Sequence, residues 1–377
     1  MPSIGNGIGI PFGNRFSFSQ YWATRTPSDL IVTGMRDTEI DFAWTDNSAG
    51  EASFKIYKST DGVNYTADGT TLAGVTTYTA TGLTAGNLYY FYVVGVKDSN
   101  ESPATNIYDT RFKITVDTTK AGSANDTFVL PLPSAGTYDY YVDWGDGGAE
   151  EHSVVNTSLT HVYAAAGIYQ VKIRGTFPRI YFNNTGDRAK LMTIDNWGNI
   201  KWSSMLNAFY GCSNLSGTYL DNPNTAAVTT MYAMFYGCAA FNQSVANFNT
   251  AAVTSMSYMF SGCSAFNQSV ANFNTAAVTN MSAMFRACTA FKQSLATFSL
   301  ASVTDVSNML SSCNINATGT TTNYDDTLVA WAAADVPNSL NFHGGTSKYS
   351  DAGGGKAARA SLIADDLWTI TDGGEQI

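Results

Sequence analysis

The stretch VTSMSYMFSGCSAFNQSVANFNTAA at residues 253–277 recurs on both sides, in residues 228–252 and 278–302. The same residue types return every 25 positions across these three copies. A fixed period of this length predicts a solenoid, in which each unit buries its apolar face against its neighbours. The repeat core is therefore expected to consist of the apolar side chains on this period, which are Cys212, Cys238, Cys263, Cys288, Cys313, Met234, Met259, Met284, Phe241, Phe266 and Phe291.

The spacing inside one unit predicts its secondary structure. Met256, Met259, Phe260 and Cys263 follow at i, i+3, i+4 and i+7, which is one face of a helix. Residues 269–274 have the composition of a short strand. Each unit is therefore expected to contain a helix, a turn, a strand and a second turn, with the cysteines acting as small hydrophobic residues.

The exterior of the repeats is expected to be neutral. From Met205 to Cys313 the charged residues are Asp221, Arg286, Lys292 and Asp305. A surface of amides and hydroxyls suits a neutral glycan or close packing against identical protein copies. The candidate binding face comprises Gln243, Asn247, Gln268, Asn272 and Gln293. In the alternative interpretation, four asparagines form ladders of hydrogen bonds to the backbone of the repeats' own turns; they are Asn247, Asn249, Asn272 and Asn274.

The pattern Val-Thr-x-Met-x-x-Met-Phe-x-x-Cys-x-x-Phe-Asn-Gln-Ser-Val resembles the BspA-like leucine-rich repeats of bacterial surface proteins. The resemblance implies a leucine-rich-repeat-type α/β solenoid over residues 199–315. Residues 316–377 are similar to the C-terminal module that follows such repeats, and we expect it to cover the last coil. Helices are predicted there at residues 324–331 and 357–364, and a strand begins near Leu367.

Two β domains are predicted before the repeats. In residues 26–112, Trp44, the Leu83–Tyr89 segment and Ser102-Pro103 resemble a fibronectin type III domain. In residues 113–198, the turn at residues 144–147 (WGDG) and the strand at residues 160–163 (THVY) are similar to a PKD domain. The expected fold class is therefore multidomain: two all-β immunoglobulin-like sandwiches, then the α/β repeat solenoid with its C-terminal cap.

Residues 1–25 are rich in glycine and then in aromatic residues. They are either a disordered tail or, in the interpretation we favour, an anchor that buries its aromatic side chains on another subunit. The candidate anchor residues are Phe12, Phe16, Phe18, Tyr21 and Trp22.

The sequence contains few features typical of a catalytic site, a metal site, a nucleic-acid-binding surface or a membrane span. It lacks the common hydrolase, zinc-protease and nucleotide-binding motifs, so we expect no catalytic residue, no cofactor and no metal. The pair Asp146 and His161 is interpreted as structural, and the loop at residues 61–64 lacks a full set of calcium ligands. A net charge of −10 without a basic cluster argues against nucleic acid, and no apolar run of membrane-spanning length occurs.

Two sandwiches followed by a repeat array are typical of an extracellular adhesin, yet the first residues lack a secretory signal. We therefore expect a non-enzymatic bacteriophage structural protein, made in the host cytoplasm and displayed on the virion as a head fibre, capsid decoration or tail-associated fibre. Residues 1–25 would contact other virion proteins, and the repeats would meet a host surface glycan or protein in many copies or as a homo-oligomer. The alternatives are a bacterial cell-surface adhesin and a glycan-degrading tail spike.

Overall fold

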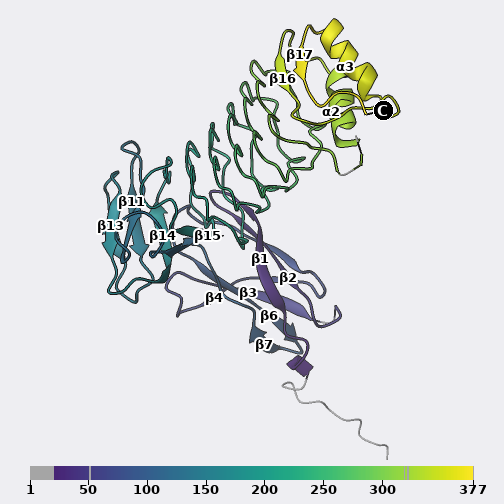
Figure 1. Cartoon of the computed structure of the whole chain (residues 1–377). Coiled ribbons are helices and arrows are strands. Elements are labelled where there is room, and N and C mark those ends of the chain that lie inside the picture. The colour runs from purple at the N-terminus through teal and green to yellow at the C-terminus, as the bar shows by residue number, and fades with distance from the viewer. Residues whose placement is uncertain (1–20, 51, 318, 321, 377) are drawn as a thin grey trace, which may run out of the picture. The chain divides into compact units, whose positions relative to one another are not determined.

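The computed structural model describes residues 21–50, 52–317, 319–320 and 322–376 (Figure 1). The protein is multidomain and mostly β, with helices α2 and α3 near its C-terminal end. It divides into two compact units. Of the described residues, the first contains 21–31, 41–50, 52–80 and 89–108, and the second contains 32–40, 81–88, 109–317, 319–320 and 322–376.

The N-terminal domain is an antiparallel sandwich. One sheet has the order β1-β2-β5 and the other the order β4-β3-β6-β7, with β8 also paired to β6. The alternating sequence of β2 turns Phe42 and Trp44 inward, where they meet Phe91 and Phe54 at ring-centroid distances of 4.8 and 5.4 Å. The strands are β1 (Ser28–Met35), β2 (Ile40–Thr45), β3 (Ser53–Ser59), β4 (Thr66–Thr71), β5 (Thr77–Ala80), β6 (Tyr90–Lys97), β7 (Asn100–Ala104) and β8 (Tyr108–Asp109).

The following domain is a second sandwich, with a five-stranded sheet of order β12-β11-β14-β9-β15 and a two-stranded sheet of β10 and β13. Apolar and polar residues alternate along these strands as well, and they point to opposite faces of the sheet: Ile114 and Val116 of β9 are buried, while Lys113 and Thr115 are partly exposed. The strands are β9 (Phe112–Asp117), β10 (Thr127–Leu130), β11 (Asp139–Asp143), β12 (Glu151–Ser153), β13 (Leu159–Val162), β14 (Ile168–Thr176) and β15 (Leu191–Asn196).

A buried lysine ties two loops of this domain together. The Nζ atom of Lys190 donates hydrogen bonds to the carbonyl oxygens of Ser123, Ala124 and Thr127 at 3.2, 2.8 and 2.7 Å. The Asp187 carboxylate lies 3.8 Å from the same nitrogen and accepts the backbone N–H of Val129 at 2.7 Å. The charge is therefore compensated where it is buried.

The repeats follow β15 as narrow stacked turns that lead to α2 (Figure 1). Within residues 203–316, all of which the structure describes, neither the predicted helix nor the predicted strand of each unit is present. In the unit at 253–277, the N–H groups of Met256, Tyr258 and Phe260 donate to carbonyls of the next unit at 2.9 Å. The N–H groups of Met259 and Cys263 instead close local i→i+3 turns at 3.1 and 2.9 Å.

This division of hydrogen bonds explains why the helix prediction is wrong. Consecutive i→i+3 turns give the buried side chains the same three- and four-residue spacing as a helix. Every second N–H group, however, donates to a carbonyl of the next unit, as in a parallel sheet. Isolated parallel bridges mark that register at Thr230, Ser255, Asn280 and Asp305. Each turn needs a left-handed residue, such as Gly262 with φ of 75° in the central unit.

The second sandwich and the repeats share one continuous hydrophobic core, which extends from Phe112 to Trp368. Strand β15 belongs to the five-stranded sheet, yet its Thr193 also forms a parallel bridge with Ser216. The ring of Trp197 contacts that of Phe209 at 5.8 Å. The sheet edge therefore serves as the first layer on which the repeat units stack.

The C-terminal module covers the last repeat unit. It consists of α2 (Thr322–Ala332), β16 (Asn341–His343), α3 (Gly355–Ala364) and β17 (Thr369–Thr371), with β16 and β17 parallel. The helices fall where the sequence predicted them. The N–H of Leu310 donates to the His343 carbonyl at 3.0 Å, and that of Thr346 donates to the Cys313 carbonyl at 2.7 Å. Backbone groups that a further repeat would have satisfied are therefore satisfied by the module.

Candidate functional site

The five cysteines lie in a buried column inside the repeats, and none forms a disulfide. Each of the last four thiols donates to the carbonyl of a phenylalanine in the preceding unit; Cys263 Sγ lies 2.9 Å from the Phe235 oxygen and Cys288 Sγ 2.8 Å from that of Phe260. Burial raises the pKa of the Cys212, Cys238 and Cys263 thiols. All five thiols are buried, and a thiol without access to solvent is a poor nucleophile, so this column has a packing role.

The other predicted core residues line the same interior. Each has an exposed fraction of 0%, and the residues are Met234, Met259, Met284, Phe241, Phe266 and Phe291. The phenylalanine rings form two parallel columns. In one of them Phe260 lies 5.8 Å from Phe235 and 5.6 Å from Phe285, with nearly parallel ring planes. The repeat interior is therefore a close-packed structural element.

The glutamines of the candidate binding face are engaged within the protein. Gln243 is 2% exposed, and its Nε2 donates to the Ser216 carbonyl at 2.7 Å, so its assignment to an outer face is wrong. The Nε2 of Gln268 donates to Asn242 Oδ1 at 3.1 Å, and that of Gln293 donates to the Asn267 carbonyl at 3.0 Å. This column links each unit to the one before it, because its side chains point back along the array.

The asparagines of the same face lie further out. Asn247 and Asn272 are both exposed, and Asn272 Nδ2 donates to the Ala246 carbonyl at 3.3 Å. Asn249 and Asn274 are exposed as well, but their Oδ1 atoms accept backbone N–H groups two residues on, at 3.1 Å in both cases. Asn249 and Asn274 therefore serve to close their own turns. Of the asparagines on this face, Asn247 and Asn272 remain as candidates for binding a ligand.

Sequence reasoning missed a group of four tyrosines on the first three units. Tyr210 and Tyr236 stack with centroids 4.6 Å apart and an interplanar angle of 4°. Tyr258 lies 5.7 Å from Tyr236 and 5.8 Å from Tyr232, whose side chain is 38% exposed. The signal in the sequence was departure from the repeat, since the units that follow have serine, alanine, asparagine or arginine at the matching positions.

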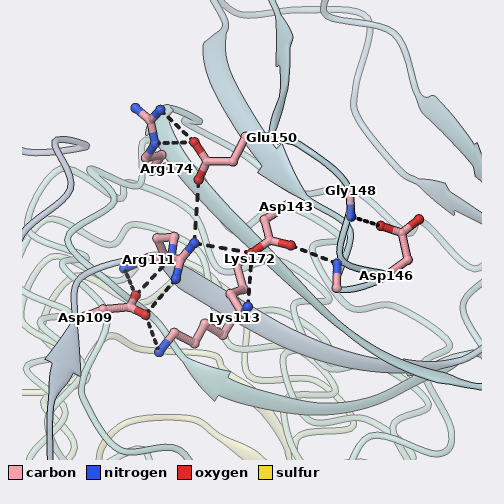
Figure 2. Close-up of polar contacts among 10 residues, drawn as sticks. Asp109, Arg111, Lys113, Asp143, Asp146, Gly148, Glu150, Lys172 and Arg174 are labelled. Carbon is pink, nitrogen blue, oxygen red and sulfur yellow. Dashed lines mark hydrogen bonds and ion pairs between the residues drawn. The ribbon is translucent and has the colours of Figure 1, made fainter. Parts of the chain in front are cut away.

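The second sandwich carries a dense ion-pair network on the outer side of its five-stranded sheet (Figure 2). Arg111 is its centre, with Nη2 3.0 Å from Asp109 and Nη1 3.3 and 3.5 Å from Asp143 and Glu150. Further pairs are Lys113 with Asp109, Lys172 with Asp143 and Arg174 with Glu150. Each of these charges has a partner inside the network, which therefore ties β9, β11 and β14 together.

Burial acts to raise the pKa of Asp109, but the hydrogen bond from Arg111 and the charges of Lys113 and Arg111 outweigh it. The net effect is a pKa below the ordinary value of an aspartate. Asp109 is thus held ionised, as a structural partner in the network requires.

Asp146 and His161 do come together, with Nε2 of the histidine 2.9 Å from Oδ2 of the aspartate. Trp144 stacks on the imidazole at 4.7 Å, and the Gly148 N–H donates to the second carboxylate oxygen at 3.0 Å. The Gly148 hydrogen bond, followed by that of His161, lowers the pKa of Asp146. These contacts fix the turn between β11 and β12, which matches the structural interpretation of the pair.

No group of three or more His, Cys, Asp or Glu side chains suited to a metal ion occurs in the part of the chain that the structure describes. In the loop at residues 61–64, Asp61 Oδ1 accepts the N–H groups of Val63 and Asn64 at 2.8 and 2.7 Å. This carboxylate therefore closes its own turn. Among the described residues, none of the helices combines the length and hydrophobicity that a bilayer crossing requires.

The candidate anchor residues divide into two groups. Phe12, Phe16 and Phe18 lie outside the described residues. Trp22 is 4% exposed and covers Gly95 of β6, where an added Cβ would lie 2.6 Å from its ring. Its role as an anchor on another subunit is therefore wrong, because the ring is already buried in its own domain. Tyr21 is half-buried and packs edge-on against Trp22 at 4.8 Å.

Comparison with known families identifies two modules of the chain. Residues 25–111 match the fibronectin type III domain, and residues 203–326 match the family described as "Mycoplasma protein of unknown function, DUF285". The chain therefore contains a fibronectin type III domain at its N-terminal end and a DUF285 domain, which is BspA-like, in the repeats. No curated protein matches the chain.

Solved structures that resemble this chain do so in part. A Fn3-like protein from Clostridium thermocellum is 26% identical over 23% of this chain and 91% of that one, with a TM-score of 0.21. A two-domain fibronectin type III segment of chicken tenascin is 17% identical over 39% of this chain and 89% of that one, with a TM-score of 0.21. The twitchin kinase region from C. elegans is 19% identical over 22% of this chain, with a TM-score of 0.21, and this chain covers 16% of its length.

Proposed function

We propose that this chain is a non-enzymatic structural and adhesive protein of a bacteriophage particle, namely a head fibre, capsid decoration or tail-associated fibre. The N-terminal segment would dock on other virion proteins, and the repeats would present a surface for a host glycan or protein. The observation that carries the proposal is the character of the repeats, which bury their cysteine, methionine and phenylalanine side chains and leave a broad, nearly uncharged exterior.

The proposal includes a finer description of the domains. Residues 199–315 form a leucine-rich-repeat-type solenoid, and residues 113–198 form a PKD-like sandwich. In-register parallel bridges from Thr230 to Asp305 support the solenoid. The turn at Asp146 with the adjacent strand β13 supports the PKD-like assignment.

The state of the cysteines supports synthesis in the host cytoplasm. All five are free and buried, which suits a protein that folds in a reducing compartment. A virion protein folds there and meets the host surface after lysis. Many copies on one particle would raise a weak single-site affinity by about 10²–10⁴ through multivalency.

Immunogold labelling tests the location. Antiserum raised against the recombinant chain is applied to purified phage particles and, as a control, to uninfected bacteria from the same culture. We expect label on the particles. Label confined to the bacterial surface would contradict the virion assignment and favour a cell-surface adhesin.

Two further assays test the activity. The recombinant chain is expected to bind host cells and to reduce adsorption of the phage. Release of reducing sugar from host polysaccharide would instead contradict the non-enzymatic assignment and favour a glycan-degrading tail spike.

A further inference from the structure

Four tyrosines occupy positions where the repeat pattern has other residues. Tyr232 aligns with Ser257 and Ser282, and Tyr258 aligns with Ala233 and Ala283. Tyr236 aligns with Tyr210 before it and with Ser261 and Arg286 after it. The stacking of the units does not require tyrosine at these positions, because the same array continues without it.

The tyrosine at position 258 has a conformational cost. Its φ is 59°, in the left-handed region that a bulky residue rarely adopts. The matching residues, Ala233, Ala283 and Asn308, have φ values of 50°, 52° and 55°, so the turn itself imposes this conformation. A large aromatic residue kept at a strained position indicates that its side chain has a use beyond the fold.

The four side chains present aromatic rings and unused hydroxyls together. Within the described residues, none of the four phenolic hydroxyls has a hydrogen-bond partner. Tyr236 stacks on Tyr210 in the preceding unit and on Tyr258 in the following unit, so its edge and hydroxyl are the parts that a ligand would meet. Tyr232 is the most exposed of the group and lies edge-on to Tyr258 with an interplanar angle of 61°, which leaves its ring available for stacking.

These properties define the chemistry of the ligand. A pyranose ring has a face of C–H groups that packs on the electron-rich face of an aromatic ring, and its hydroxyls pair with phenolic O–H groups. Tyrosine also gives a large rigid contact area at low conformational cost. The four tyrosines themselves carry no charge, which suits a neutral ligand. Two arginines lie along the same column, Arg188 beside Gly211 and Arg286 two units from Tyr236.

We propose that Tyr210, Tyr232, Tyr236 and Tyr258 form a binding site for a neutral glycan. This site deepens the proposed function and rests on it, since it names where the displayed surface takes its ligand. It differs from the candidate face at Asn247 and Asn272.

The test exchanges the tyrosines for residues that the same chain already holds at the matching positions. The triple variant Tyr232→Ser, Tyr236→Ser and Tyr258→Ala copies the following units, so its fold is expected to persist, and thermal unfolding checks this. The full-length chain and the variant are applied to a printed array of neutral and acidic bacterial oligosaccharides. We expect the unchanged protein to bind neutral glycans and the variant to bind them at least about tenfold more weakly.

Two matched controls use the same kind of exchange. Thr297→Asn copies Asn247 and Asn272 on another face, and Arg286→Ser copies Ser261 on the tyrosine column. Both are expected to bind as the unchanged protein does. Loss of binding in Arg286→Ser together with binding confined to acidic glycans would overturn the assignment of a neutral ligand.

The remaining outcomes separate the site from the proposed function. Equal glycan binding by the triple variant would overturn the tyrosine site while leaving glycan display intact. Absence of glycan binding by the unchanged protein, or binding to another protein at these tyrosines, would also overturn the site. The immunogold experiment then decides the location of the protein independently.

Discussion

Phe260 offers a direct test of how the repeat units stabilise one another. Its side chain has an exposed fraction of 0% and contacts Phe235, Phe266 and Phe285 at centroid distances of 5.8, 4.2 and 5.6 Å. Replacement by alanine removes a buried ring that has neighbours in its own unit and in both adjacent units. Such substitutions cost about 3–5 kcal/mol, and the lost ring contacts place this one near the upper end.

Differential scanning calorimetry of Phe260→Ala measures the effect. Because the second compact unit is large, each kcal/mol lowers its Tm by roughly 2–4 °C, so a decrease of about 10 °C or more is expected. Asn272→Ala, on the outside of the same unit, is the control and is expected to change stability by less than about 0.5 kcal/mol. A loss below about 1 kcal/mol in Phe260→Ala would refute the continuous stacked core.

Three other predictions concern the sandwiches. Lys190→Met is expected to cost about 3–5 kcal/mol in urea unfolding, because the buried Asp187 carboxylate loses its nearby cation and the carbonyls of Ser123, Ala124 and Thr127 lose a donor; a neutral effect would contradict a structural role for Lys190. The pKa of Asp109 is lowered in the folded state, so its stabilisation is present above the ordinary aspartate pKa and is lost as the pH falls through the folded value. Urea midpoints measured between about pH 6 and pH 3 should fall more steeply for the unchanged protein than for Asp109→Asn, and parallel curves would argue against the network. Trp22→Ala is expected to destabilise the fibronectin type III domain by about 3–5 kcal/mol, whereas an unchanged melting curve would restore the external-anchor interpretation.

The sequence period predicted which residues share the interior, but it could not predict the local backbone. Met256, Met259 and Phe260 have the spacing of a helix, and that spacing also arises from consecutive turns whose alternate N–H groups bond to the next unit. The choice between the two depends on where the hydrogen bonds go, which is a property of the stacked array. A single unit does not contain that information.

Side-chain burial within a column was equally hard to predict. Gln243 is buried and donates to the Ser216 carbonyl in the irregular unit before it, whereas Gln268 and Gln293, at the matching positions, are partly exposed. For Trp22 the sequence indicated burial but not the surface that receives the ring, which is Gly95 of its own domain. The tyrosine site could have been found by asking where the repeat departs from its consensus.

The central claim is that the five cysteines form one buried column within stacked units, and thiol labelling tests it most directly. Full-length protein is treated with a thiol reagent such as dithionitrobenzoate, first native and then in denaturant. Because each cysteine is at most 2% exposed, we expect negligible labelling of the native protein and labelling of all five after unfolding. Rapid labelling of the native protein would contradict the stacked register.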